Sequence, residues 1–84
     1  MSKALQLKNK INIKQMNEVI NIVNEDYRSG KINNDTKIRT INTLVLLKRG
    51  EFNTINIYVK TFNEEDFIYT KDLIEKHTNH LDVG

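Results

Sequence analysis

Two histidines, His77 and His80, are the first residues whose spacing suggests chemistry, because they lie three positions apart with Asp72 and Glu75 close by. Such a group could form half of a metal site. Zinc, however, requires three or four converging ligands, and histidines are favoured in the last turn of a helix simply by its dipole. We therefore predict no metal ion and no cofactor.

The candidate catalytic groups also have simpler explanations. Glu64, Glu65 and Asp66 could supply a carboxylate pair for acid–base catalysis, but acids are favoured at the start of a helix. The chain has no cysteine, and Ser2 and Ser29 have no histidine nearby in the sequence to activate them. Its three glycines are isolated and form no phosphate-binding loop. We predict that the protein is not an enzyme.

Positive charge is concentrated in the first three quarters of the chain. Residues 1–62 contain eleven Lys or Arg against five acids, and residues 63–84 contain two against six, which together give the net charge of +2. Basic groups favour phosphates because each contact releases counterions, and an exposed tyrosine can add stacking on a base. The candidate nucleic-acid-binding residues are Lys8, Lys10, Lys14, Lys31, Lys37, Arg39, Lys48, Arg49, Tyr58 and Lys60. The alternative is that these cations are only solvated, or neutralise the acidic segment within the fold or across a dimer.

The elements that must position these residues begin after residue 12. Residues 1–12 contain lysines, no acid and few apolar side chains, and are predicted to form a flexible basic arm. Residues 13–84 are predicted to form a single helical domain.

Two amphipathic helices are predicted to form a hairpin. Apolar residues at three- and four-residue steps predict a helix from Ile13 to about Arg28, ended by Gly30. A second helix, capped by one of the polar residues at 33–35, is predicted to end at Gly50. Ile32 should fold back onto the first helix. The inward-facing residues are predicted to be Ile13, Met16, Val19, Ile20, Val23 and Tyr27 in the first helix, and Ile38, Ile41, Leu44 and Val45 in the second.

Residues 52–62 are ambiguous. Their β-branched and aromatic content favours a strand, whereas their spacing also permits a helix with Phe52, Ile55, Val59 and Phe62 on one side. A strand here would pair with residues 43–47 and would break the second helix. We favour the helix. A final helix is predicted from a cap at Asn63 to about His80, with an apolar side of Phe67, Ile68, Leu73, Ile74, His77 and Leu81.

The predicted fold class is therefore mainly α, with three to four short helices in one small domain. The alternative is an α+β fold with a β-hairpin at about 43–61. Because a chain of 84 residues buries only a limited core, and residues 44–47 are apolar on all sides, we also expect a homodimer. The predicted core comprises Met16, Val19, Ile20, Val23, Ile38, Ile41, Leu44, Val45, Phe67, Leu73 and Ile74.

The leading functional hypothesis is a small nucleic-acid-binding or regulatory accessory protein. Residues 45–62 fit a DNA-binding helix-turn-helix poorly, because Asn56 falls where an apolar residue is required. The Asn-, Ile- and Lys-rich composition is typical of accessory genes of low-GC bacteria and their phages, which suggests a phage origin. The alternative is an inhibitor or adaptor that binds a host protein through the acidic last helix or the helical hairpin. With no signal-peptide pattern, and no apolar run near the roughly 20 residues that cross a bilayer, we expect no membrane association and a cytoplasmic location.

Overall fold

Four helices form the domain in the computed structural model: α1 (Ile13–Arg28), α2 (Asn34–Arg49), α3 (Phe52–Val59) and α4 (Glu64–Asp82). The structure describes residues 4, 5, 7 and 10–82, without the side chains of residues 78–82. These residues contain no strand, so the mainly α prediction is confirmed and the alternative β-hairpin is not formed. None of the helices in this part of the chain combines the length and the apolar character needed to cross a membrane.

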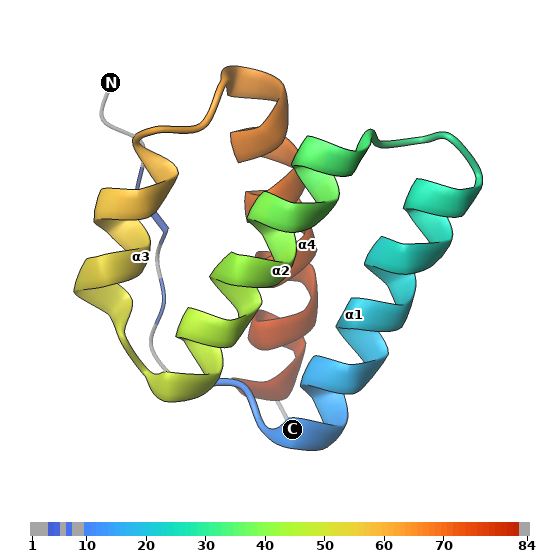
Figure 1. The fold of residues 1–84 in the computed structure, drawn as a ribbon. Helices are drawn as coiled ribbons and strands as arrows, with labels where there is room; N and C mark the ends of the chain where they lie inside the picture. The colour runs from blue at the N-terminus through green and yellow to red at the C-terminus, as the bar shows by residue number, and fades with distance from the viewer. Residues whose placement is uncertain (1–3, 6, 8–9, 83–84) are drawn as a thin grey trace.

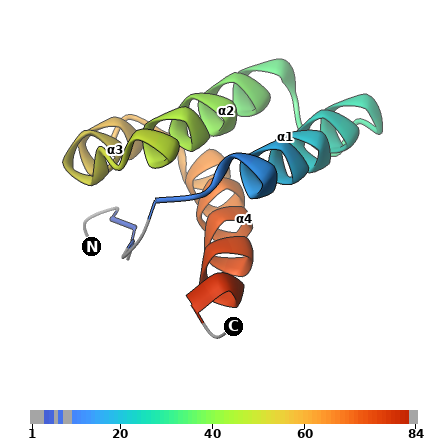
Figure 2. The same cartoon turned by 90° about the horizontal axis from the view of Figure 1, so that it is seen from below.

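α2 is the central helix of the domain. It packs against α1, α3 and α4, and α1 also packs against α4. In Figure 1, α1, α2 and α3 run alternately up and down in one layer. Figure 2 shows that α4 lies on one side of this layer and is steeply inclined to it. The start of α1 and the end of α2 therefore share one end of the domain.

The turn between α1 and α2 is closed by the backbone of Asp26. Its carbonyl oxygen accepts hydrogen bonds from the backbone N–H groups of Lys31 and Ile32, at 2.9 and 3.3 Å. Gly30 has a φ of 82°, a left-handed conformation that would cost a residue with a Cβ about 1–2 kcal/mol. Asn33 then caps α2 through its side-chain oxygen. The predicted helical hairpin is confirmed.

Local signals also set the bounds of the last two helices. Gly50, with a φ of 75°, ends α2. Residues 52–62, the ambiguous segment, contain the helix α3, which buries Ile55 and Val59, and Phe62 beyond its end is buried as well. Oδ1 of Asn63 accepts a hydrogen bond from the backbone N–H of the third residue of α4 at 2.8 Å, so the predicted cap is confirmed.

The inward face of α2 differs from the prediction. Ile38, predicted to be in the core, is 46% exposed. The buried positions are instead Thr36, Thr40 and Thr43 together with Leu44 and Leu47. α2 is therefore rotated relative to the stripe expected from its isoleucines.

Hydrogen bonds allow the threonines to face inward. Thr40 Oγ1 lies 2.9 Å from Oγ1 of Thr70 on α4, and both residues are buried. Thr43 donates to a backbone carbonyl of its own helix at 2.8 Å, and Thr36 donates to the carboxylate of Asp66 at 2.5 Å. Burying a hydroxyl is unfavourable unless it has such a partner.

The rest of the predicted core is largely confirmed. Tyr27 and Ile13, expected on the inward stripe of α1, are 39% and 62% exposed, because they lie at the two ends of the helix, while Ile68 is 48% exposed on α4. Half-buried residues packed against the core include Ile20, Ile41, Val45 and Phe67. The buried members of the prediction are Met16, Val19, Val23, Leu44, Leu73 and Ile74.

The described part of the N-terminal segment lies along α3, on the side on which α4 is found (Figures 1 and 2). Leu5 and Ile11 are buried in the same core as the helices. The backbone N–H of Leu5 donates to Oδ1 of Asn56 at 2.9 Å. The flexibility predicted for residues 1–12 stays a prediction, but these two side chains extend the core beyond the predicted domain boundary at residue 12.

Candidate functional site

Four of the predicted basic residues meet where α1 begins and α2 ends. Lys10 precedes α1 and Lys14 lies in its first turn, whereas Lys48 and Arg49 lie in the last turn of α2. Because α1 and α2 are antiparallel, these segments share the lower end of the domain in Figure 1. A Cβ placed on Gly50 would lie only 3.8 Å from Cδ of Lys10. We call these four residues the basic end.

The charges of the basic end are exposed to solvent. All four residues are solvent-exposed. α1 has no acid in its first turn, so the charge of Lys14 adds to the positive end of the helix dipole. Glu51 is the acid that pairs with the group, with Oε2 3.8 Å from Nη1 of Arg49, and both side chains are well solvated. Such an exposed pair holds its partners only weakly.

The predicted basic residues beside the α1–α2 turn lie at the opposite end, and two of them contact other residues of the protein. Nζ of Lys37 lies 4.1 Å from the centroid of the Tyr27 ring, a cation–π contact. Arg39 forms a 2.8 Å ion pair with the buried carboxylate of Asp66. Lys31 is exposed and reaches a groove between α1 and α4. Lys31, Lys37 and Arg39 are therefore neighbours in the sequence but contact different parts of the protein.

Two further candidates, Tyr58 and Lys60, lie away from the basic end. Lys60 is exposed just after α3, at the other end of that helix from Gly50. Tyr58 is half-buried, with its ring edge-on to Phe62 at a centroid distance of 4.9 Å, and its hydroxyl accepts a 3.2 Å hydrogen bond from Asn42. Lys8 lies outside the described residues.

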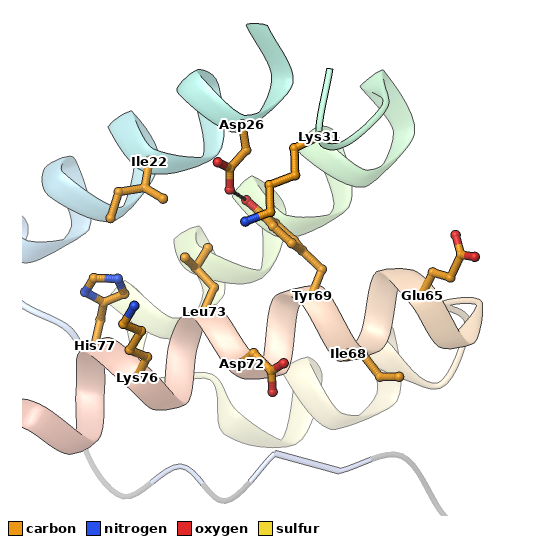
Figure 3. A pocket seen from close by; sticks show the side chains of 10 residues that line it. All are labelled: Ile22, Asp26, Lys31, Glu65, Ile68, Tyr69, Asp72, Leu73, Lys76 and His77. Atoms are coloured by element: carbon orange, nitrogen blue, oxygen red, sulfur yellow. Dashed lines mark hydrogen bonds between the residues drawn. The ribbon is translucent and has the colours of Figure 1, made fainter. Parts of the chain in front are cut away.

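A groove of about 600 Å³ between α1 and α4 is a second candidate site, which sequence reasoning did not find. Ile22 of α1 and Leu73 of α4 form its apolar walls (Figure 3). Tyr69 reaches across from α4, and its hydroxyl donates a 2.6 Å hydrogen bond to Oδ2 of Asp26. The bond links the two helices beneath the groove.

Tyr69 is held in its protonated form. Burial raises the pKa of its phenol well above the ordinary value near 10, and the hydrogen bond to Asp26 and the charge of that carboxylate raise it further. The phenol therefore stays a hydrogen-bond donor to Asp26 even at a pH where an ordinary tyrosine ionises.

Charged residues form the rim of the groove. Glu65 lies toward one end, and Lys76 and His77 lie toward the other (Figure 3). In the stretches of chain that the structure describes, no three His, Asp or Glu side chains converge on a point that could hold a metal ion. The side chain of His80, the second histidine of the sequence pair, lies outside those stretches.

The sequence contained only one local signal for this groove. Ile68 is an apolar residue on the same helical face as Glu65, Asp72 and Lys76, where polar residues would be expected. The opposite wall is formed by α1, and Asp26 and Tyr69 are 43 positions apart. No local pattern predicts that contact.

No protein-family model matches the chain, and neither a curated protein nor a solved structure matches it. The basic end and the α1–α4 groove are therefore the two features from which function can be inferred.

Proposed function

We propose that the protein is a small nucleic-acid-binding accessory protein that contacts phosphates through the basic end. The observation that supports the proposal is the exposure, on one end of the domain, of Lys10, Lys14, Lys48 and Arg49 from two separate segments. Clustered cations of this kind bind a polyanion because each phosphate contact releases condensed counterions.

The position of Lys14 adds support. A lysine in the first turn of a helix opposes the helix dipole and costs stability of about 0.3–1 kcal/mol. No acid in that turn offsets the cost. Glu18, four residues along α1, offsets part of this cost, and a bound phosphate would interact favourably with both the ammonium group and the end of the helix.

The proposed contact is with the sugar–phosphate backbone. Tyr58, which could have stacked on a base, packs against Phe62 and is bonded by Asn42 instead. Phosphate contacts position a protein on nucleic acid but carry no sequence information. We therefore infer that the protein binds nucleic acid with low sequence specificity. Any regulatory effect would arise because the bound protein covers the nucleic acid. The proposal includes no catalytic step.

The proposal is tested by measuring binding to labelled single- and double-stranded oligonucleotides by fluorescence anisotropy over a range of salt concentrations. The variant Lys10→Gln, Lys14→Gln, Lys48→Gln removes three charges of the basic end. Each lost phosphate contact is expected to lower the slope of log K against log[salt] by about 0.7–0.9. Circular dichroism should show unchanged helix content, because all three side chains are exposed.

A matched control removes three exposed charges elsewhere, in the variant Arg28→Gln, Lys31→Gln, Lys60→Gln. The control should keep most of the affinity and the original salt slope. Equal losses in the two variants would show that only net charge matters, and would contradict a defined site. Absence of binding at low salt would contradict the whole proposal. A protein partner would instead bind with little salt dependence.

A further inference from the structure

We propose that the α1–α4 groove is the interface of a symmetric homodimer, in which α4 of one chain lies antiparallel to α4 of a second copy. Ile68 of each chain would enter the groove of its partner. The proposal is independent of nucleic-acid binding, because it concerns a different face of the domain and makes no use of the basic end.

The apolar part of the face is an exposed isoleucine beside an open groove. Ile68 is 48% exposed beside a groove of about 600 Å³. The groove walls include the half-buried Ile22 and the buried Leu73, and the ring of Tyr69 lies further along the groove, toward Asp26 (Figure 3). An apolar side chain that enters this groove would remove apolar surface of both molecules from water.

The charges on this face are complementary to a second copy of themselves. Glu65, Ile68, Asp72 and Lys76 follow one another at steps of three, four and four residues, so they lie on one side of α4. Glu65 and Lys76 are about 16 Å apart along the axis, at opposite ends of the groove. Antiparallel pairing about a twofold axis near residues 70 and 71 places each Glu65 opposite the Lys76 of the other chain. A twofold axis makes this pair occur twice.

The remaining charged groups are compatible with this arrangement. The carboxylate of Asp26 already accepts the hydrogen bond from Tyr69. The twofold axis brings the two Asp72 carboxylates toward each other; both are exposed, and Lys76, four residues further along the same helix, offsets part of their repulsion. His77 and Lys31 lie on the rim, where they can remain hydrated. The interface therefore requires no fully buried, unpaired charge.

A second copy fits this face better than other partners. A rim with both signs of charge does not favour a polyanion. A second apolar groove, about 340 Å³ beside α2 and α3, is lined by residues that include Val45, Leu46 and Tyr58, and its described lining contains no charged residue to set an orientation. Leu46, one of the residues at 44–47 that are apolar on all sides, is half-buried beside α3.

The first test is sedimentation equilibrium of the full chain and two single variants. Ile68→Asp should raise the dimer dissociation constant by about tenfold or more, because it places a charge in the partner groove. Ile57→Asp is the matched control, since Ile57 is 68% exposed on α3, and it should leave the constant unchanged. A chain that stays monomeric at high micromolar concentration would overturn the proposal. A dimer weakened by Ile57→Asp but not by Ile68→Asp would overturn it equally.

The second test is charge exchange. Glu65→Lys and Lys76→Glu should each weaken the dimer by about three- to tenfold, because each creates two like-charge pairs. The double variant restores two opposite-charge pairs across the interface and should dimerise more tightly than either single variant. Glu64→Lys, which changes an exposed acid outside the groove, is the control and should have little effect. Failure of the double variant to recover dimerisation would overturn the antiparallel arrangement.

Discussion

Nη1 of Arg39 lies 2.8 Å from Oδ2 of Asp66, which joins the middle of α2 to the first turn of α4. The two partners differ in burial. The Asp66 side chain is 5% exposed, whereas that of Arg39 is 37% exposed. Removing the arginine would therefore leave a buried carboxylate with Thr36 as its one remaining side-chain donor among the described residues. Removing the acid would leave a cation that water can reach.

We expect the two halves of this ion pair to respond unequally to substitution. Arg39→Met should lower the free energy of unfolding by about 3 kcal/mol, and Asp66→Asn by about 1–2 kcal/mol. Urea denaturation measures both. Arg28→Met is the control, because its pair with Glu25 is about two-thirds exposed and should contribute less than about 1 kcal/mol. Equal effects of Arg39→Met and Arg28→Met would contradict a structural role for the Arg39 pair.

The hydrogen bond between Thr40 and Thr70 should show strong coupling. Either single change to valine leaves one buried hydroxyl without this partner, at an expected cost of about 1–3 kcal/mol. The double change to valine removes both hydroxyls with little change in shape and should be nearly neutral. A double-mutant cycle from denaturation midpoints gives the coupling directly. Additive losses would mean that the two hydroxyls do not depend on each other.

Leu5 tests whether the N-terminal segment belongs to the core. Leu5→Ala should destabilise the protein by about 2 kcal/mol, at the low end for a buried leucine because the end of a chain can adjust. Ile13→Ala is the control, since Ile13 is 62% exposed and should lose much less. Thermal unfolding monitored by circular dichroism compares the two. No loss for Leu5→Ala would support an arm that is free of the core.

Tyr69 should make stability depend on alkaline pH. Folding favours the protonated phenol, because its pKa is raised in the native state. The stabilisation is therefore fully present below the ordinary tyrosine pKa of about 10, and it is lost as the pH rises from there toward the raised native pKa. Tyr69→Phe should be less stable by about 1 kcal/mol at neutral pH, and the difference from the wild type should shrink above about pH 10. A difference independent of pH would contradict the role of the Tyr69–Asp26 bond.

The helices could be predicted because their ends are encoded locally. Gly30 and Gly50 both adopt positive φ, and Asn33 and Asn63 both cap the following helix. These signals need only a few neighbouring residues. In the ambiguous segment the helical spacing indicates the helix but not its end: Ile55 and Val59 are buried as that spacing requires, whereas α3 ends at Val59, before Phe62.

The inward rotation of α2 could not be predicted in the same way. Hydropathy ranks Ile38 above Thr40, but the hydroxyl of Thr40 is satisfied by Thr70, thirty positions away. The same limit applies to the cations, because sequence grouped Arg39 with Lys31 although Arg39 pairs with a distant buried acid. Both the burial of Thr40 and the pairing of Arg39 depend on residues far away in the sequence, and a single sequence does not show which distant residues will be in contact.

Asp26 accepts hydrogen bonds through both its backbone carbonyl and its side-chain carboxylate, and the two sets of bonds indicate an order of folding. Its carbonyl closes the α1–α2 turn through Lys31 and Ile32, contacts that require only a very short loop. Its carboxylate meets Tyr69 only after a loop of 43 positions has closed, which carries a larger entropic cost. The helical hairpin can therefore nucleate first, with the carboxylate already in place when α4 arrives. Local contacts of this kind favour rapid folding, as in other small helical domains.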